Sequence, residues 1–353
     1  MTDAAVAGRL LDEYHDRLAG PAGIRVLGGS EHQSRITYRV ILPDGEAQVI
    51  RAFRADEPVP VHGRDVAGEN LVAWLTGRAR TLAVLADAAY PAPRPVRTRT
   101  GELVGVTGPW LTWATTYVPG PVVVPSLDQL RQVGAALGHL HSVAARPGGH
   151  RIGDGPPGLS SRHPAVAVPA SLARLDRVGS RLPAVWLPLH GECRAALADV
   201  AEAGRSMPET IVHGDVRARN AVQSSPSGVT LVDWETGGLG LAVVDFGNAL
   251  LECHLDADLR DDQASGWLIT PSPDRIKAVA SGYARMRPLS GPEFAFLPAA
   301  VKFTAAVVGS AYFEVALADG VTGPAIEARI AWLENRLGVA EEVAAIARAS
   351  LTC

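Results

Sequence analysis

The chain contains little lysine and little cysteine, and each shortage excludes a class of chemistry. Lys277 and Lys302 are the only lysines among 353 residues, and neither follows a glycine. Because a Walker A loop requires Gly-Lys-Ser/Thr, the P-loop NTPases are excluded. The three cysteines, Cys193, Cys253 and Cys353, are widely spaced and form no Cys-x-x-Cys pair. We therefore expect neither a disulfide framework nor a zinc site, and we predict a reducing, cytoplasmic location.

The sequence also lacks a strong net charge and an unbroken apolar run. A formal charge of −4 gives no electrostatic argument for a nucleic-acid partner. The first eighteen residues alternate charges with small apolar residues and contain no signal-peptide core. The most apolar stretch, Phe294 to Leu317, is interrupted by Pro298, Lys302 and Glu314. We therefore expect a globular protein without a membrane span and without a nucleic-acid partner.

β-type patterns dominate the first third of the chain. Short β-branched runs occur at 24–27, 36–42 and 47–53, and Pro43-Asp44-Gly45 between the last two predicts a hairpin. We predict two helical stretches next, one around residues 66–75 and one from Thr81 to Ala89. Extended segments then follow from Val104 to Tyr117.

Helical patterns dominate the remainder. Apolar residues at helical spacing predict a helix over Leu127–Val143, and another is expected over about 189–203. Residues 146–170, rich in Gly, Pro, Ser and Arg, predict a loop-rich insertion. The predicted class is α+β with two lobes, a β-rich N-terminal lobe over 1–117 and a mainly helical C-terminal lobe over 118–353.

Three polar residues in the helical part are spaced as phosphoryl transfer requires. Asp215 follows a short apolar run, Asn220 comes five positions later, and Asp233 ends the next apolar run. Phosphoryl transfer needs a group that orients the attacking hydroxyl and accepts its proton, together with oxygen ligands for magnesium. The protein-kinase catalytic loop, H-R-D-x-x-x-x-N, has the same interval between its Asp and Asn. This segment therefore predicts a kinase centre.

The motifs His-Gly-Asp-x-x-x-x-Asn at 213–220 and Val-Asp-Trp-Glu at 232–235 resemble those of the aminoglycoside phosphotransferase and choline kinase group. The resemblance implies a protein-kinase-like fold that uses ATP and Mg²⁺ to phosphorylate a small-molecule hydroxyl acceptor. It makes Asp215 the catalytic residue and Asn220 and Asp233 the magnesium ligands. It also implies that His213 braces the loop.

Asp245-Phe246-Gly247 spells the metal-binding triplet of protein kinases, but it lies twenty-five residues after Asn220. Because Asp233 is the better placed metal ligand, we predict that Asp245 starts a helix or braces a loop.

A glycine-containing turn near residue 28 is a candidate phosphate-binding element. Backbone amides in such turns can approach phosphates, although two glycines between strands also occur in plain hairpins. The Ser-x-x-Thr-Tyr run that follows resembles the same family. By that resemblance, the nucleotide contacts in this turn are Gly28, Gly29, Ser30 and Ser34.

The resemblance implies four further nucleotide-binding positions. Arg51 stands where the family fold usually has a phosphate-binding lysine, and Glu69 would be its ion-pair partner. A solvated surface pair is the alternative for these two residues. The backbone at Thr116 and Val118, in the linker between the lobes, would meet the adenine edge.

The acceptor is left open by these motifs. A group of acidic residues after position 250 could bind a polycationic antibiotic or form an ordinary solvated face: Glu252, Asp256, Asp258, Asp261 and Asp262. Arginines in the insertion would equally suit an anionic or nucleoside-like acceptor: Arg151, Arg162 and Arg174. Three hypotheses follow. They are an antibiotic kinase that gives resistance or self-resistance, a metabolic kinase of an amino alcohol, sugar or homoserine-like compound, and a catalytically inactive nucleotide-binding protein.

Overall fold

The computed structural model describes residues 10–15, 23–29, 35–57, 59–61, 64–66, 68–143, 157–226, 228–255, 268–318 and 324–351. The chain forms two compact units. The first comprises Met1–Pro119 and Gly149–Gly158, and the second comprises Gly120–Gly148 and Leu159–Cys353. The first unit is rich in strands and the second is mainly helical, so the predicted two-lobed α+β class is confirmed.

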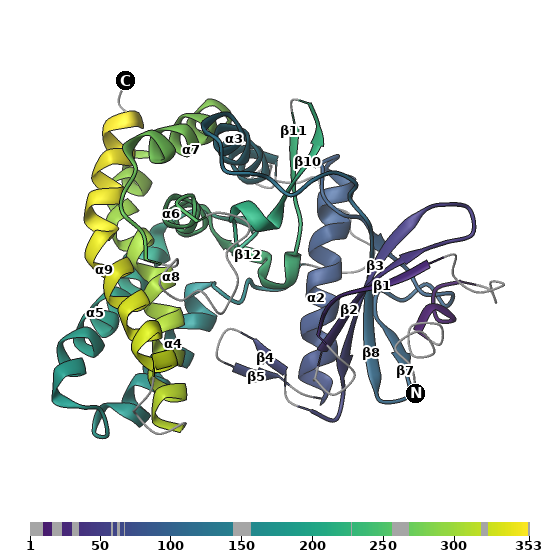
Figure 1. The fold of residues 1–353 in the computed structure, drawn as a ribbon, viewed down its shortest axis with the longest axis horizontal. Coiled ribbons are helices and arrows are strands. Elements are labelled where there is room, and N and C mark those ends of the chain that lie inside the picture. The colour runs from purple at the N-terminus through teal and green to yellow at the C-terminus, as the bar shows by residue number, and fades with distance from the viewer. Residues whose placement is uncertain are drawn as a thin grey trace. The chain divides into compact units, whose positions relative to one another are not determined.

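The first unit is built on one antiparallel sheet (Figure 1). Its strands, in the order in which they pair, are β1 (Gly23–Gly29), β2 (Arg35–Ile41), β3 (Ala47–Arg54), β8 (Trp110–Thr116) and β6 (Pro95–Val96), and β7 (Gly105–Thr107) also pairs with β8. A separate two-stranded pair consists of β4 (Val59–Val61) and β5 (Arg64–Val66). One face of the large sheet is apolar because alternate residues of β2, Ile36, Tyr38 and Val40, are fully buried.

The predicted hairpin between β2 and β3 is confirmed. Gly45 occupies the turn with φ of +88°, a conformation that glycine adopts without a Cβ clash. Leu10, Leu11 and Tyr14 are buried in the same core as the β2 side chains. Tyr14 also donates a hydrogen bond from its hydroxyl to Thr112 Oγ1 at 2.9 Å. Residues 1–9 and 16–22 lie outside the described residues.

The two predicted helical stretches around residues 66–89 are one helix, α2 (Gly68–Asp87), so this division was wrong. Gly77 lies in its middle but does not end it. A Cβ at Gly77 would come within 3.1 Å of Gly158 Cα, so the glycine allows another backbone to approach the helix. Thr81 donates from Oγ1 to the Gly77 carbonyl at 2.9 Å and stays helical.

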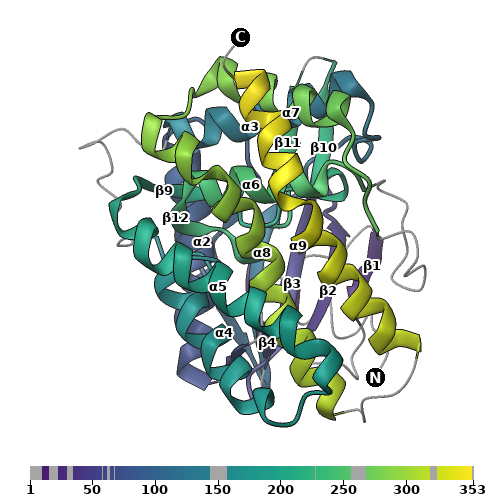
Figure 2. The same ribbon diagram turned by 90° about the vertical axis from the view of Figure 1, so that its left-hand side faces the viewer.

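The second unit surrounds one buried helix, α6 (Ala242–Glu252), in which every residue is buried. The other α-helices among the described residues of this unit are α3 (Leu127–Val143), α4 (Pro164–Gly179), α5 (Leu187–Ala203), α7 (Pro273–Met286), α8 (Gly291–Ala318) and α9 (Pro324–Leu351). Helices α4, α5 and α9 all pack on α8, and their ribbons run side by side in Figure 2. Helix α3 packs on α7, with Gly134 and Gly282 at the contact. A Cβ on either glycine would overlap a backbone carbonyl of the other helix.

Helix α4 corrects the predicted loop-rich insertion over 146–170. Residues 164–170 are helical, and His163 caps the helix by accepting a hydrogen bond at Nδ1 from the Ala165 amide at 3.1 Å. The prolines that suggested a loop lie at the first helical position and inside the helix, at Pro164 and Pro169. Residues 144–156 lie outside the described part.

Helix α8 is long and apolar enough over Gly291–Glu314 to cross a membrane by composition alone. In the protein, 61% of its most apolar window is buried. Core helices of soluble proteins pass the same test, so this helix is weak evidence for a membrane span.

Two short antiparallel strand pairs of the second unit carry the motif residues. β9 (Glu209–Val212) pairs with β12 (Gly238–Leu241), and β10 (Ala221–Ser225) pairs with β11 (Gly228–Leu231). The strands β10 and β12 were not predicted from the sequence, because β10 ends in serines and β12 alternates with glycine.

Candidate active site

The His-Gly-Asp loop begins where β9 ends. Gly214 has φ of +79°, and a Cβ there would lie 3.0 Å from the Thr236 side chain, so this turn requires glycine. Thr236 donates from Oγ1 to the His213 carbonyl at 2.7 Å. The loop that carries Asp215 is therefore fixed by the segment that follows Asp233.

Asp215 is held by donors on both of its carboxylate oxygens. Oδ1 accepts from Arg217 Nε at 3.1 Å and Nη2, and from Arg162 Nη2 at 3.3 Å. Oδ2 accepts from Asn220 Nδ2 at 2.8 Å. Hydrogen bonds between charged groups are short and directional, so they fix the orientation of the carboxylate as well as its position.

Asn220 and Asp233 are brought together by the backbone. The Val232 amide donates a hydrogen bond to the Asn220 carbonyl at 2.8 Å. Asp233 is the next residue in the chain, so this bond keeps its backbone near Asn220. Asn220 also donates from Nδ2 to the Asp215 carbonyl at 2.9 Å. Because Nδ2 is directed at Asp215, the amide oxygen of Asn220 is the atom left for a cation.

Asp233 has a left-handed backbone conformation, with φ of 67° and ψ of 65°. Non-glycine residues in this region are uncommon and occur often at functional sites. Among the described residues, no group of three or more His, Cys, Asp or Glu side chains could hold a metal ion. One Asn and one Asp nevertheless fit magnesium, which keeps several waters and takes its other ligands from phosphate.

Asp245 braces the loop from the first turn of α6, as predicted. Its Oδ2 accepts from the His213 amide at 2.7 Å and its Oδ1 accepts from the Gly214 amide at 2.9 Å. His141 donates from Nε2 to Oδ2 at 3.3 Å. Burial raises the pKa of Asp245, but the hydrogen bonds and charges of its partners outweigh burial and hold the pKa below its ordinary value.

His141 is fully buried, as expected for a packed histidine. Burial lowers its pKa despite the opposing charge of Asp245, so the ring is neutral at pH 7. The Tyr283 hydroxyl oxygen lies 2.9 Å from Nδ1 and donates a hydrogen bond to it, because the ring hydrogen is on Nε2. The neutral imidazole therefore connects α7 to the carboxylate that fixes the loop.

His213 is also a bracing residue by its contacts. Its Nε2 donates to the Val232 carbonyl at 2.9 Å, and its Nδ1 accepts from the Asp215 amide at 3.3 Å. Its ring lies edge-on to Trp234, with centroids 4.7 Å apart. Together with the bond from the Val232 amide to the Asn220 carbonyl, these contacts join the two sequence motifs.

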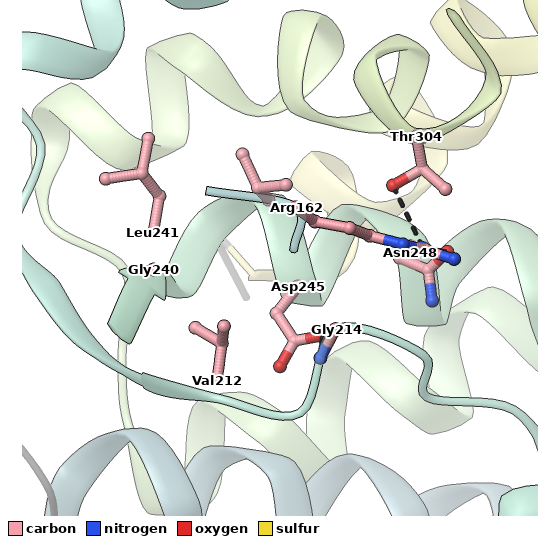
Figure 3. Close-up of a pocket in the computed structure, with 9 residues that line it drawn as sticks. Arg162, Val212, Gly214, Gly240, Leu241, Asp245, Asn248 and Thr304 are labelled. Atoms are coloured by element: carbon pink, nitrogen blue, oxygen red, sulfur yellow. Dashed lines mark hydrogen bonds between the residues drawn. The ribbon is translucent and has the colours of Figure 1, made fainter. Parts of the chain in front are cut away.

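Arg162 and Asn248 belong to this site, although neither lies in the motifs that predicted it (Figure 3). Arg162 donates from Nη1 to Asn248 Oδ1 at 2.7 Å and to Thr304 Oγ1 at 3.4 Å. Asn248 donates from Nδ2 to the Val216 carbonyl at 3.3 Å. Asn248 lies three residues after Asp245 in the sequence, so the two side chains share one face of α6. That spacing is the sequence signal by which Asn248 could have been found.

The nucleotide-binding residues predicted from the resemblance are only partly described. Ser30 and Ser34 lie outside the described residues. Gly28 and Gly29 end β1, where a bulge shifts the pairing with β2 between Val26 and Gly28.

Arg51 is buried, lies opposite Trp113 in the β3–β8 register, and places its guanidinium 5.3 Å from the centre of that ring. Glu69 is exposed in the first turn of α2. Among the contacts of the described residues, no ion pair joins Arg51 to Glu69, so this pairing stays a prediction.

Two positions, Thr116 and Val118, were predicted to place their backbone at the adenine edge, and a backbone hydrogen bond fixes the first of them. Thr116 ends β8, and its amide donates to the Arg94 carbonyl at 2.9 Å. Val118 follows β8 by two residues and is half-buried.

Glu252 does not belong to an exposed group of acidic residues after position 250, as one of the two predictions had it. Its carboxylate is buried at the end of α6, 3.6 Å from Arg336 Nε on α9. It is therefore part of an interior ion pair and not of a solvent-facing acidic surface. Asp256, Asp258, Asp261 and Asp262, like Arg151, lie outside the described residues. Arg174 is buried and faces Glu314 and Ser310.

Comparison with protein-family models identifies the family of the chain. The model of the phosphotransferase enzyme family matches residues 44–289. No curated protein sequence matches the chain. Among solved structures, an amicoumacin kinase in complex with AMP-PNP, Ca²⁺ and Ami has a TM-score of 0.67 and 11% identity, over 96% of this chain and 94% of the other.

Two further structures give the same fold. A microcompartment-associated aminopropanol kinase has a TM-score of 0.59 and 20% identity, over 96% of this chain and 97% of the other. A spectinomycin phosphotransferase in complex with ADP and spectinomycin has a TM-score of 0.58 and 12% identity, over 97% and 98%. At these identities the likeness shows the fold alone.

Proposed function

The chain belongs to the phosphotransferase enzyme family, and from this premise we propose that it transfers the γ-phosphate of ATP to a hydroxyl of an antibiotic or similar natural product. One observation carries the proposal. Asp215 is held on both carboxylate oxygens, and the backbone amides before it are held by Asp245, so the loop is preorganised around one carboxylate. Preorganisation of this kind is the main protein contribution to phosphoryl transfer.

In the proposed mechanism, Asp215 accepts a hydrogen bond from the acceptor hydroxyl and orients it for attack on the γ-phosphorus. As the new P–O bond forms and the bond to ADP breaks, the hydroxyl proton passes to Asp215 late in the step. Arg217 lies beside Asp215. Burial lowers the pKa of Arg217, but the charges of Asp215 and Glu252 outweigh this and raise the pKa, so it remains cationic where negative charge develops.

The amide oxygen of Asn220 and the carboxylate of Asp233 would hold Mg²⁺. When bound, this ion neutralises charge on the phosphates. Of the first unit, Arg51 would bind phosphate, the β1 glycines would offer backbone amides, and the Thr116–Val118 backbone would meet adenine.

The acceptor class rests on the similar structures. Two of them are structures of antibiotic kinases in complex with a nucleotide and a second ligand. They support an antibiotic as the acceptor and, by extension, a role in resistance or self-resistance. An amino alcohol is the second candidate, because the aminopropanol kinase has the highest identity of the three, 20%. The interior ion pair of Glu252 removes one acidic group from the surface that a polycationic aminoglycoside would need. The inactive alternative is disfavoured by family membership and by the organised Asp215 loop. We also propose that the enzyme works in the cytoplasm.

The test is a panel of antibiotics and amino alcohols with Mg-ATP, in which ADP release and the mass of each acceptor are measured. We expect one acceptor to gain a phosphoryl group, with turnover lost in Asp215→Ala and ATP binding kept. Asp176→Asn, a change in an exposed aspartate of α4, serves as the control and should keep wild-type turnover. Turnover in Asp215→Ala equal to that of Asp176→Asn would overturn the assignment of Asp215.

A further inference from the structure

We propose that Arg162 is a positioning residue for phosphoryl transfer, which holds Asp215 from the interior of the second unit. The inference rests on the proposed function and adds to it a residue that lies outside both sequence motifs. Arg162 is 5% exposed, yet its guanidinium reaches Asp215 Oδ1 at 3.3 Å. Its other nitrogen, Nη1, donates to Asn248 and Thr304, on α6 and α8.

The backbone fixes Arg162 from both sides. Before it, the Ser160 amide donates to the Leu239 carbonyl at 2.8 Å, and Ser160 Oγ donates to the Thr236 carbonyl at 2.7 Å. After it, α4 begins at Pro164 with His163 as its cap. Arg162 therefore has little freedom to leave the loop. Asn248, which it contacts, also holds the Val216 carbonyl, one residue beyond Asp215.

Burial of the Arg162 guanidinium is energetically unfavourable, as is typical of a functional residue. A buried guanidinium loses hydration, and burial lowers the pKa of Arg162 in spite of the charge of Asp215. Its Nε has no hydrogen-bond partner among the described residues and is itself buried. Arg162 also lines a hollow with room for about one water molecule, beside Gly214, Asp245 and Asn248.

Removing one partner of a buried ion pair destabilises a fold strongly when it leaves the other charge without compensation. Asp215 would keep Arg217 and Asn220 as partners if Arg162 were removed. The arginine therefore adds orientation at Asp215 more than it adds stability to the fold.

Arg162→Met and Arg162→Lys test this, with Arg174→Met as a matched control. Arg174 is another buried arginine of the second unit, and it contacts Ser310 and Glu314. For Arg162→Met we expect a melting temperature within about 5 °C of the wild type. We expect kcat to fall about 100-fold, with the KM values for ATP and acceptor within about threefold.

Arg162→Lys should recover part of the loss, to about tenfold below wild type, because an ammonium keeps the charge but not the planar fork. Arg174→Met should keep kcat within about threefold of wild type.

Three results would overturn the proposal. The first is a kcat of Arg162→Met equal to that of Arg174→Met, and the second is unfolding of Arg162→Met. The third is a rise in KM without a fall in kcat. Failure of the proposed function would look different, because the wild type itself would then phosphorylate no acceptor.

Discussion

Asp245→Asn is the sharpest test of how the catalytic loop is held. The wild-type carboxylate accepts from the His213 amide at 2.7 Å, the Gly214 amide at 2.9 Å and His141 Nε2 at 3.3 Å. An asparagine of the same shape has one acceptor oxygen, and its NH₂ group must face another donor. One buried N–H is then left unsatisfied, which costs about 1–3 kcal/mol, and the remaining bonds lose the carboxylate charge, at about 1 kcal/mol.

The expected loss for Asp245→Asn is therefore about 3 kcal/mol of the free energy of unfolding. At about 2–4 °C per kcal/mol for a unit of this size, the melting temperature should fall by about 6–12 °C. We also expect kcat to fall about 100-fold, because the amides that precede Asp215 lose their anchor. Differential scanning calorimetry and a steady-state assay measure the two effects. Asp128→Asn, at an exposed aspartate of α3, is the control.

The difference in melting temperature between the wild type and Asp245→Asn should depend on pH. Because the pKa of Asp245 is lowered in the folded state, its contribution is present above its unfolded value of about 4. That contribution is lost as the pH falls through the folded value. The gap in melting temperature between wild type and Asp245→Asn should therefore shrink under acid conditions. A melting temperature for Asp245→Asn within about 2 °C of wild type at pH 7 would refute the bracing role.

Two further predictions concern the cofactors. Asp233→Asn should raise the magnesium concentration for half-maximal turnover by at least about tenfold, because a charged ligand is lost, and a Mg²⁺ titration at fixed ATP tests this. An unchanged titration would remove Asp233 from the metal site. Arg51→Met should raise the KM for ATP about tenfold with little change in the KM for the acceptor, since the substitution removes the proposed phosphate contact. An unchanged KM for ATP would assign the phosphate contact to another residue.

Features set by short-range rules could be predicted from the sequence. The Pro43-Asp44-Gly45 segment contains the residues typical of a tight turn. In α3, over Leu127–Val143, apolar residues recur at helical spacing. The brace at Asp245 was predictable because Asp233 already supplied the better metal ligand. For the turn and for α3, the information lies within the feature itself, and for Asp245 it lies in the spacing of two motifs along the sequence.

Features set by tertiary packing could not be predicted. Helix α2 was predicted as two helical stretches, but it continues through Gly77, and this glycine makes room for Gly158, eighty-one residues away in sequence. The prolines near 164–169 hid α4, since a proline at the start of a helix and one in a loop look alike in sequence. Arg162 reaches Asp215 only because Ser160 is tied to Leu239 and Thr236, and no local pattern announces that contact.

The most direct test of the central claim is ³¹P NMR of the reaction of the wild-type enzyme with Mg-ATP and the acceptor found in the panel. We expect a phosphomonoester on the acceptor, formed in equal amount to ADP and absent with Asp215→Ala. ADP accompanied only by free inorganic phosphate, or the same phosphomonoester from Asp215→Ala, would contradict it.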